Sequence, residues 1–493
     1  MSFYLPIVLS VVAAIIAVRW NYFKILSIAK EKRIVDNPNA RKLQKNPVPI
    51  LGGIAAFFGV VTGVLTGSSV SWIFSGYPLF SLAPVLCAMV IMVYVGAADD
   101  ILGLSPTSRF LIEILTILGI VYASGGCIDS FHGLWGVESY SWWFAVPLTV
   151  LTGVGIINSI NMIDGVNGLS SGLCIMYCCL FGVIFTMAGE LPNAMLSFTM
   201  AASLIPFLLH NVFGERSRMF IGDAGTMMLG VLLSWFTISL LRSDTSVRLI
   251  AIQKNIDMFA MVLAFMSVPV FDTVRVMTLR ILNKKSPFHP DKTHLHHIFI
   301  RMGVSHSITS LIEICINLLI VLIWAMCAKF HCSLNVQFYV VVVAGMLLVW
   351  GSFFFLRYHE NRHTEFMHSL ARFSIKTHLG SKAWWLRLQN RLDEPEGEHK
   401  EIKMTTMPVS SVYAFYHFDE IDPGDFKEVD RRKLFDFLKG RAEVLMEDIR
   451  QNSGADPLRV DNLVREGIRD GFIVIVKENP WDGPEIVSLT EEM

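Results

Sequence analysis

The chain alternates between long apolar runs and short polar clusters. Many of the runs approach the roughly 20 residues that an α-helix needs to cross a bilayer. They predict about eleven membrane spans, at residues 3–19, 48–66, 79–97, 110–123, 143–157, 168–187, 194–210, 226–241, 256–274, 311–329 and 336–356. The pattern therefore predicts an all-α polytopic membrane protein.

Four polar clusters lie where predicted spans end. They are Asp99-Asp100, residues 158–168, residues 221–225 and residues 289–297. The number of spans between them places all four on the same side of the membrane. Carboxylates, amides and imidazoles collected on one face of an apolar protein favour a site for a metal ion and a phosphate-bearing substrate.

The basic residues predict the orientation, because Lys and Arg favour cytoplasmic loops. They are concentrated after the first span, from Arg19 to Lys45, and after the ninth span, from Arg275 to Arg301. Both loops are cytoplasmic if the N-terminus is outside, and the four polar clusters are then cytoplasmic as well. The first run lacks a basic leader and a small-residue cleavage site, so we expect it to remain as a helix.

Composition agrees with a membrane protein. Of 493 residues, 53% are hydrophobic and 17% are charged, whereas soluble domains carry about 25% charged residues. The net charge of −1 conceals basic inner loops, which would attract phosphates or anionic lipid. Most of the eight cysteines fall inside predicted spans, where a thiol packs as a small hydrophobic group, and the sequence cannot pair Cys127 with Cys332.

The chain changes character near residue 357. We predict a transmembrane catalytic domain at 1–357 and a basic amphipathic interfacial linker at 358–393, for which an ordinary connecting helix is an equal alternative. Residues 394–493 predict a small cytoplasmic α/β appendage, with helices at 433–449 and 457–470 and a strand at 471–477. We find no catalytic motif in this appendage.

The carboxylates suggest a cation site. Asp99 and Asp100 repel each other, and a bound cation would relieve that repulsion; a solvated loop that limits helix sliding is an equal alternative. Asp223 falls in the first turn of the helix predicted at 226–241, where free N–H groups favour anions and a carboxylate can hold a hard cation against a diphosphate. A simple helix cap is the commoner role of such an aspartate.

A series of amides precedes a turn. Asn158, Asn161 and Asp164 recur every three residues and therefore share one helical face, and Gly165 and Gly168 then break the helix. Such aligned groups can hydrogen-bond a ribose, a base or a sugar, although an Asn/Asp-Gly string is also a generic turn signal.

The histidines form a fourth group. His294, His296 and His297 lie too close together for easy tetrahedral zinc ligation without partners, and no cysteine is near. Hydrogen bonds to phosphate or sugar, helped by Lys292, are the favoured role, and stray surface histidines are the alternative.

Motifs recur in a fixed order along residues 1–357. They are Asp36-x-Pro38-x-x-Arg41-Lys42, Pro47-x-Pro49-x-x-Gly52-Gly53, Asp99-Asp100, Asn158-x-x-Asn161-x-x-Asp164-Gly-x-Asn167-Gly-Leu, Asn211, Phe220-x-Gly222-Asp223-x-Gly225, Phe271-Asp272-Thr273 and His294-Leu-His296-His297. In this order the chain resembles the polyprenyl-phosphate N-acetylhexosamine-1-phosphate transferases of glycosyltransferase family 4, most closely the bacterial undecaprenyl-phosphate N-acetylglucosamine-1-phosphate transferases. Gln44 and Asn167 depart from residues common in that family, His and Asp respectively.

The resemblance implies transfer of a sugar-1-phosphate from a UDP-N-acetylhexosamine to a polyprenyl phosphate, which releases UMP and initiates cell-envelope glycan synthesis, for example of cell wall or lipopolysaccharide. It implies Mg²⁺, with Mn²⁺ as a substitute. It implies catalytic roles for Asp99, Asp100 and Asp223, with Asp223 and Asp99 as metal ligands. The substrate-binding residues that we expect are Lys45, Asn158, Asn161, Asp164, Asn167, Asn211, Arg275, Lys292, His294, His296 and His297.

The expected location is a bacterial inner membrane, with the active site and the C-terminus in the cytoplasm. The expected partners are the sugar nucleotide, the lipid and the bilayer, with no nucleic acid, and a homodimer is one open assembly. Two other functions remain open. Phospho-N-acetylmuramoyl-pentapeptide transferases usually have three successive histidines where this chain has His-Leu-His-His. A transporter is the other, but it would need polar residues at mid-span.

Overall fold

The structure is a computed structural model that describes residues 3–36, 47–76, 80–286, 293–362, 366, 369–370, 374, 382–393, 444–445, 464, 473–479 and 483–489. The chain forms two compact units, Met1–Lys403 and Met404–Met493, which we describe separately.

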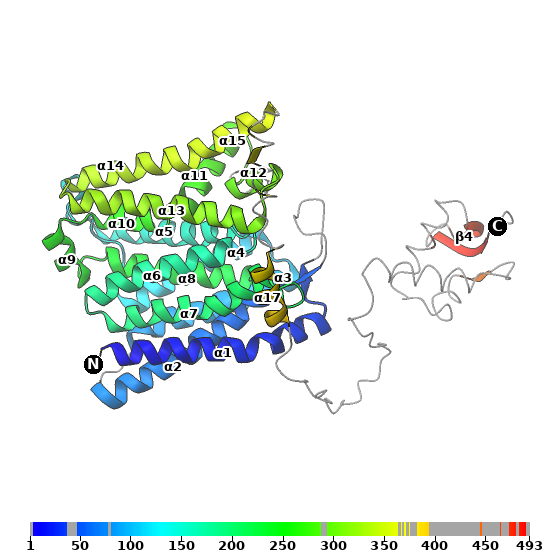
Figure 1. Ribbon diagram of the computed structural model, residues 1–493, viewed down its shortest axis with the longest axis horizontal. Coiled ribbons are helices and arrows are strands. Elements are labelled where there is room, and N and C mark those ends of the chain that lie inside the picture. The colour runs from blue at the N-terminus through cyan, green and yellow to red at the C-terminus, as the bar shows by residue number, and fades with distance from the viewer. Residues whose placement is uncertain are drawn as a thin grey trace. The chain divides into compact units, whose positions relative to one another are not determined.

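The first unit is a bundle of long helices (Figure 1). Its long helices are α1 (Tyr4–Glu31), α2 (Gly52–Ser75), α3 (Ala83–Leu102), α4 (Pro106–Ser124), α5 (Trp142–Met162), α6 (Leu169–Met187), α7 (Leu191–Phe213), α8 (Gly222–Leu241), α13 (His306–Lys329) and α14 (Leu334–Gly345), which continues through a π-helical turn, η3 (Met346–Trp350), into α15 (Gly351–Asn361). The shorter helices are α9 (Val247–Lys254), α10 (Met258–Phe265), α11 (Ser267–Leu282), α12 (Leu295–Arg301) and α17 (Ala383–Asp393), with single 3₁₀ turns η1 (Phe80–Leu82) and η2 (Leu134–Gly136).

Among the described residues, ten helices are long and apolar enough to cross a membrane, and α10 with α11 makes up to eleven. The predicted all-α polytopic membrane fold is therefore confirmed. The predicted ends are less accurate. The first helix, predicted at 3–19, continues to Glu31, and the second, predicted at 48–66, runs from Gly52 to Ser75.

The span predicted at 256–274 is wrong as a single helix. It breaks at Met266, and α10 and α11 meet at an angle of 81°. Asn317 of α13 satisfies the backbone groups that the break frees: its Oδ1 accepts a hydrogen bond from Val268 N at 3.0 Å, and its Nδ2 donates to Phe265 O at 2.9 Å. Because lipid offers no hydrogen bonds, a broken helix at membrane depth needs such a protein partner.

Helix α8 is the centre of the bundle, and every residue from Ala224 to Leu241 is buried. Its first turn lies against α3 at Gly96, where a Cβ would come within 2.4 Å of Asp223 O and Ala224 N. The missing side chain therefore allows the two backbones to touch at the start of α8.

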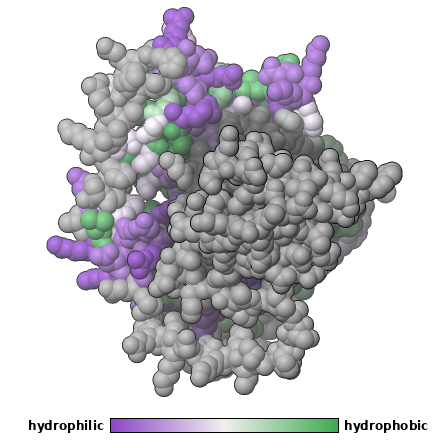
Figure 2. All heavy atoms as spheres, turned by 90° about the vertical axis from the view of Figure 1, so that its right-hand side faces the viewer, coloured by the Kyte–Doolittle hydropathy of each residue, from purple (hydrophilic) through white to green (hydrophobic). Residues whose placement is uncertain are grey.

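Consecutive long helices run in opposite directions. The end of α3, the start of α4, the end of α5 and the start of α8 consequently lie at one end of the bundle, the right-hand end in Figure 1. Figure 2 faces this end, and hydrophilic side chains predominate where the grey atoms leave its surface visible at the top and left. It also holds a short antiparallel pair, β1 (Val35–Asp36) and β2 (Val48–Pro49). The prediction that the polar clusters share one side is confirmed for their described residues.

The second unit contains a three-stranded antiparallel sheet in the order β3 (Val444–Leu445), β5 (Gly483–Leu489), β4 (Ile473–Asn479). Strand β4 overlaps the strand predicted at 471–477. The helix predicted at 433–449 is interrupted by β3, and the rest of it, like nearly all of the helix predicted at 457–470, lies outside the described residues. The predicted domain boundaries at 357 and 393 remain predictions.

Candidate active site at one end of the bundle

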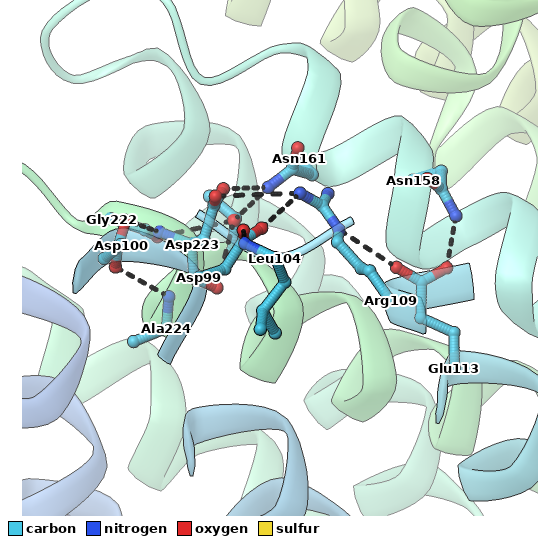
Figure 3. A network of polar contacts seen from close by, with 11 residues as sticks. Asp99, Asp100, Leu104, Arg109, Glu113, Asn158, Asn161, Gly222, Asp223 and Ala224 are labelled. Carbon is cyan, nitrogen blue, oxygen red and sulfur yellow. Dashed lines mark hydrogen bonds and ion pairs between the residues drawn. The ribbon is translucent and has the colours of Figure 1, made fainter. Parts of the chain in front are cut away.

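Two carboxylates from different helices meet at one guanidinium (Figure 3). Arg109, in the first turn of α4, places Nη1 3.0 Å from Asp99 Oδ2 and 3.6 Å from Asp223 Oδ2. Asp99 is three residues before the end of α3, and its Oδ1 accepts a hydrogen bond from Leu104 N at 2.7 Å. Leu104 follows α3, so this bond fixes the turn into α4 and the position of Asp99 in it.

Asp100 turns the other way and caps α8. Its Oδ1 accepts from Asp223 N at 3.0 Å and its Oδ2 from Ala224 N at 3.2 Å. These are free N–H groups at a helix start, where a carboxylate is favoured by hydrogen bonding and by the helix dipole. Gly222, with φ +70°, provides the tight approach, since its Cβ would lie 2.5 Å from Asp100 Oδ2. Asp100 therefore positions the helix that carries Asp223.

The amides at the end of α5 complete the cluster. Asn161 Nδ2 donates to Asp223 Oδ1 at 2.6 Å and to Thr226 Oγ1 at 2.8 Å. Asn158, one turn earlier, donates to Glu113 Oε2 and to Val154 O. The predicted shared helical face holds for Asn158 and Asn161 and is directed at the carboxylates, but it is wrong for Asp164, because α5 ends at Met162. We call Asp99, Asp100, Arg109, Glu113 and Asp223 the carboxylate cluster.

Arg109 and Glu113 were absent from the sequence-based site. Glu113 is buried, and its Oε1 accepts from Arg109 Nε at 3.4 Å. A signal was present, because an Arg and a Glu four residues apart at the edge of an apolar run form a pair on one helical face, and charges in a span usually mark function. Only the fold shows that this pair meets Asp99 and Asp223.

Asp164 lies in the turn after α5. Its Oδ1 accepts from Ser170 Oγ at 2.6 Å. The residue is exposed to solvent, although the surrounding protein displaces part of its hydration. Lost hydration there, reinforced by the charge of Asp223 and opposed by the Ser170 bond, raises the pKa of Asp164 to about 6.

The histidines lie beside this turn. A Cβ on Gly165 would be 2.6 Å from His296 Nε2, so the second and fourth polar clusters are in contact. His294 and His296 stack with ring centroids 5.6 Å apart, and His297 lies 4.4 Å from His296. We call these three residues the histidine cluster.

Asp272 of α11 fixes the position of the histidine cluster by hydrogen bonds. Its Oδ2 is 2.8 Å from His294 Nδ1, and its Oδ1 accepts from Leu295 N at 3.2 Å. Arg275 is fully buried, donates to Asp272 Oδ1 and to Thr293 O at 2.6 Å each, and stacks over Phe353. In this arrangement Arg275 supports the histidines, and its predicted contact with phosphate or sugar remains a prediction.

His296 is the most enclosed of the three, with 1% of its surface exposed. Burial, together with the neighbouring imidazoles His297 and His294, lowers the pKa of His296 well below its usual value. A neutral ring donates only one N–H, and His296 Nδ1 has no hydrogen-bond partner among the described residues. His296 is therefore a neutral ring with no positive charge to offer a phosphate, and its predicted contact with a sugar or phosphate remains a prediction.

Two other predicted residues are engaged with the chain itself. Asn211 Oδ1 accepts from Gly168 N at 2.8 Å, and its Nδ2 donates to Met219 O at 2.9 Å. The backbone of Asn167 is held by His306 and Ser310. Asn211 thus ties the turn after α5 to the loop before α8. The predicted residues Lys45 and Lys292 lie outside the described residues.

The carboxylate cluster fits a divalent cation shared with a substrate. Among the described residues, no group of three or more His, Cys, Asp or Glu is arranged to hold a metal on its own. Mg²⁺, however, is commonly held by one or two carboxylates, with water and substrate phosphates as its remaining ligands. Asp99 and Asp223, which converge on Arg109 Nη1, offer that pair.

Residues 82–241 match glycosyl transferase family 4, and this segment carries the whole carboxylate cluster. The chain is 34% identical over 281 residues to a probable undecaprenyl-phosphate N-acetylglucosaminyl 1-phosphate transferase of Bacillus subtilis (strain 168), covering 56% of this chain and 73% of that protein. The chain belongs to this family. It is also 30% identical to an undecaprenyl-phosphate alpha-N-acetylglucosaminyl 1-phosphate transferase of Yersinia pestis, over 55% of this chain and 70% of that protein.

A third relative of the same name, from Escherichia coli (strain K12), is 29% identical over 56% of this chain and 71% of its own length. All three relatives carry names of 1-phosphate transferases, and none carries the name of a transporter. The family resemblance derived from the motifs is thereby confirmed, and the chain is a multi-pass membrane protein of this enzyme family.

Proposed function

We propose that the protein transfers an N-acetylhexosamine-1-phosphate, with GlcNAc-1-phosphate as the first candidate, from a UDP-sugar to undecaprenyl phosphate or a similar polyprenyl phosphate, and releases UMP. The observation that carries this proposal is the meeting of Asp99 and Asp223 at Arg109, at one end of a membrane bundle. A charged lipid headgroup and a water-soluble diphosphate can both reach such a place.

The residues of the carboxylate cluster have different roles in this reaction. Asp99 and Asp223 would hold Mg²⁺, and the bound ion would supply positive charge to the diphosphate and to the leaving UMP. Asp100 fixes the start of α8, and Arg109 offers its guanidinium to the phosphate oxygens. A phosphate monoester has a second pKa of ~6, so the lipid phosphate is already largely dianionic at neutral pH. Positioning therefore contributes more than proton removal by Asp99.

The turn after α5 and the histidine cluster form the sugar-nucleotide side of the site. We assign Asn161 and Asp164 to the nucleotide, and His296 to the sugar or its phosphate. The basic loops favour a cytoplasmic orientation for this end of the bundle, at the inner membrane of a bacterium.

The test is an assay of membranes that contain the protein, with UDP-[³H]GlcNAc and undecaprenyl phosphate. We expect label in the lipid fraction and its loss with EDTA. UDP-N-acetylmuramoyl-pentapeptide as sole donor should give no lipid product. Transfer from that donor alone would show the other reaction of this family, and uptake of label without a lipid product would show a transporter.

Asp223→Asn is the sharpest variant. It keeps the side-chain volume but removes the negative charge that holds the cation, and loss of a metal ligand should reduce turnover by at least a hundredfold (about 2.7 kcal/mol). Expression and membrane insertion should be unchanged. Activity within about threefold of the parent at saturating Mg²⁺ would show that Asp223 is not a ligand.

A further inference from the structure

The loop between α7 and α8 is held by the linker helix α17, which follows the membrane bundle in sequence. Asp393, the last residue of α17, accepts hydrogen bonds from Ser217 N at 2.9 Å and Ser217 Oγ at 2.6 Å, both through Oδ1. Its Oδ2 accepts from Glu215 N at 3.1 Å. Successive backbone N–H groups directed at one anion form a nest, and here the chain supplies its own carboxylate.

Further contacts bring the rest of α17 onto the same loop. Gln389 Nε2 donates to Glu215 Oε2 at 2.6 Å. The ring of Trp385 lies 4.3 Å from that of Phe213, the last residue of α7, and Trp385 is buried. This part of the linker is consequently packed against the bundle through Trp385, whereas Trp384 and Leu386 remain exposed. The expectation of a helix lying in the lipid headgroup region omitted this contact.

Ser217 connects this contact with α1 and α7. The residue is buried; its carbonyl accepts from Tyr22 Oη of α1 at 2.8 Å, and its Oγ lies 3.0 Å from His210 Nδ1 of α7. The loop is therefore clamped between α1, α7 and α17 at this point.

The other end of the loop is the start of the active-site helix. Phe220 N donates to Pro49 O at 2.7 Å, and Phe220 O accepts from Gly52 N at 2.9 Å. Three residues further on is Asp223, whose backbone N–H is bound by Asp100. Between Ser217, which Asp393 holds, and the start of α8 there are thus only four loop residues, Arg218 to Ile221.

We propose that Asp393 is a positioning residue for the transfer reaction: its carboxylate latches the α7–α8 loop and so fixes the place of Asp223. The proposal rests on the proposed function of Asp223. It makes residues 382–393 part of the working enzyme, although they lie beyond the segment that carries the family's motifs. The C-terminal unit begins about ten residues later, so anything that pulls α17 away would loosen the site.

The carboxylate of Asp393 is suited to holding the α7–α8 loop. Burial by itself would raise its pKa, but the hydrogen bonds from Ser217 and from the backbone N–H groups outweigh burial, and the pKa of Asp393 lies below its usual range. Asp393 is therefore ionised at neutral pH, and its hydrogen bonds are of the stronger, charge-assisted kind.

The test compares Asp393→Ala with Arg391→Ala, an exposed position on the same helix, in the full chain. We expect Asp393→Ala to lower kcat about tenfold, because a charge-assisted contact is lost, and to raise the Mg²⁺ concentration for half-maximal rate. Backbone hydrogen exchange at residues 215–221 should become faster. Arg391→Ala should match the parent in all three measurements, whereas a merely structural role would leave the Mg²⁺ dependence unchanged.

Asp393→Ala with the Mg²⁺ dependence of the parent would overturn the proposal, whether or not the loop exchanges faster. If Asp393→Ala does not yield folded protein, Ser217→Ala replaces it and should give the same effects, smaller in size; parent behaviour of that variant also overturns the proposal. If the parent itself transfers no sugar phosphate, the proposed function fails, and the loop exchange still decides whether Asp393 latches the loop.

Discussion

Arg109 is the residue on which the carboxylate cluster depends. Its guanidinium compensates Asp99, Asp223 and the buried Glu113, and without it three carboxylates would repel one another in a place where water is scarce. It is also the cation through which a phosphate could be received. Because Arg109 has both tasks, its replacement should lower the rate more than the replacement of any single amide of the site.

For Arg109→Gln we therefore expect kcat to fall by about a hundredfold, because a preorganised donor to phosphate oxygens is removed. The measurement is initial rate at saturating Mg²⁺ and donor. Arg248→Gln is the matched control, since Arg248 of α9 pairs with Glu138 at the opposite end of the bundle (Figure 1), and it should leave the rate unchanged. Equal rates for both variants would remove Arg109 from the mechanism.

Asp164 predicts a pH dependence. Its pKa of about 6 means that the carboxyl gains a proton as the pH falls from 7 to 5.5. The protonated carboxyl is a weaker hydrogen-bond acceptor for the nucleotide than the carboxylate. We expect KM for the sugar nucleotide to rise over this interval and Asp164→Asn to abolish the dependence. The pKa of Asp164 is higher in the folded than in the unfolded chain, so this group stabilises the fold at low pH, and the contribution is lost as the pH rises from about 4 to about 6. Acidification therefore does not unfold the protein through Asp164, and unfolding through this group cannot account for the rise in KM.

At the scale of elements, the break between α10 and α11 decides where the histidine cluster lies. The 81° bend turns α11 so that Asp272 meets His294 and Leu295. The bend in turn depends on the amide of Asn317, which is fully buried and hydrogen-bonded to the backbone on both sides of the break.

Asn317→Leu should therefore destabilise the protein. It leaves buried backbone groups without partners, at a cost of about 1–3 kcal/mol for each group, and it should lower the midpoint of thermal unfolding in detergent by several degrees. Asn361→Leu, at an exposed helix end, is the control. A midpoint equal to that of the control would mean that the break is satisfied in some other way.

At the scale of the whole molecule, the orientation in the membrane can be tested independently of activity. Ser105 and Ser286 are exposed at the end of the bundle that carries the polar clusters, and Ser141 is exposed at the other end. In intact cells an impermeant maleimide should label Ser141→Cys and leave Ser105→Cys and Ser286→Cys unmodified, with the parent chain giving the background. Labelling of Ser105→Cys from outside would reverse the proposed orientation.

The sequence was sufficient for most of the spans, apart from the break at Met266 and several helix ends, and for the side on which the polar residues lie. Apolar runs of nearly bilayer length have few ways to be satisfied other than as helices, and alternating helices bring every second loop to the same side. The residue types at Asp99, Asn161 and Asp223 were enough to indicate a phosphate site, because their spacing relative to the spans is visible in one dimension.

The tertiary structure decided which of these groups meet. Asp99 faces Arg109 while its neighbour Asp100 caps α8, and this division of adjacent residues follows from the rotation of α3 against α8, which no local pattern records. Asp393 and Ser217 are 176 residues apart in the chain, and their contact exists only because a helix packs on a loop. Contacts of this kind depend on distance in the fold, and separation along the chain carries almost no information about them.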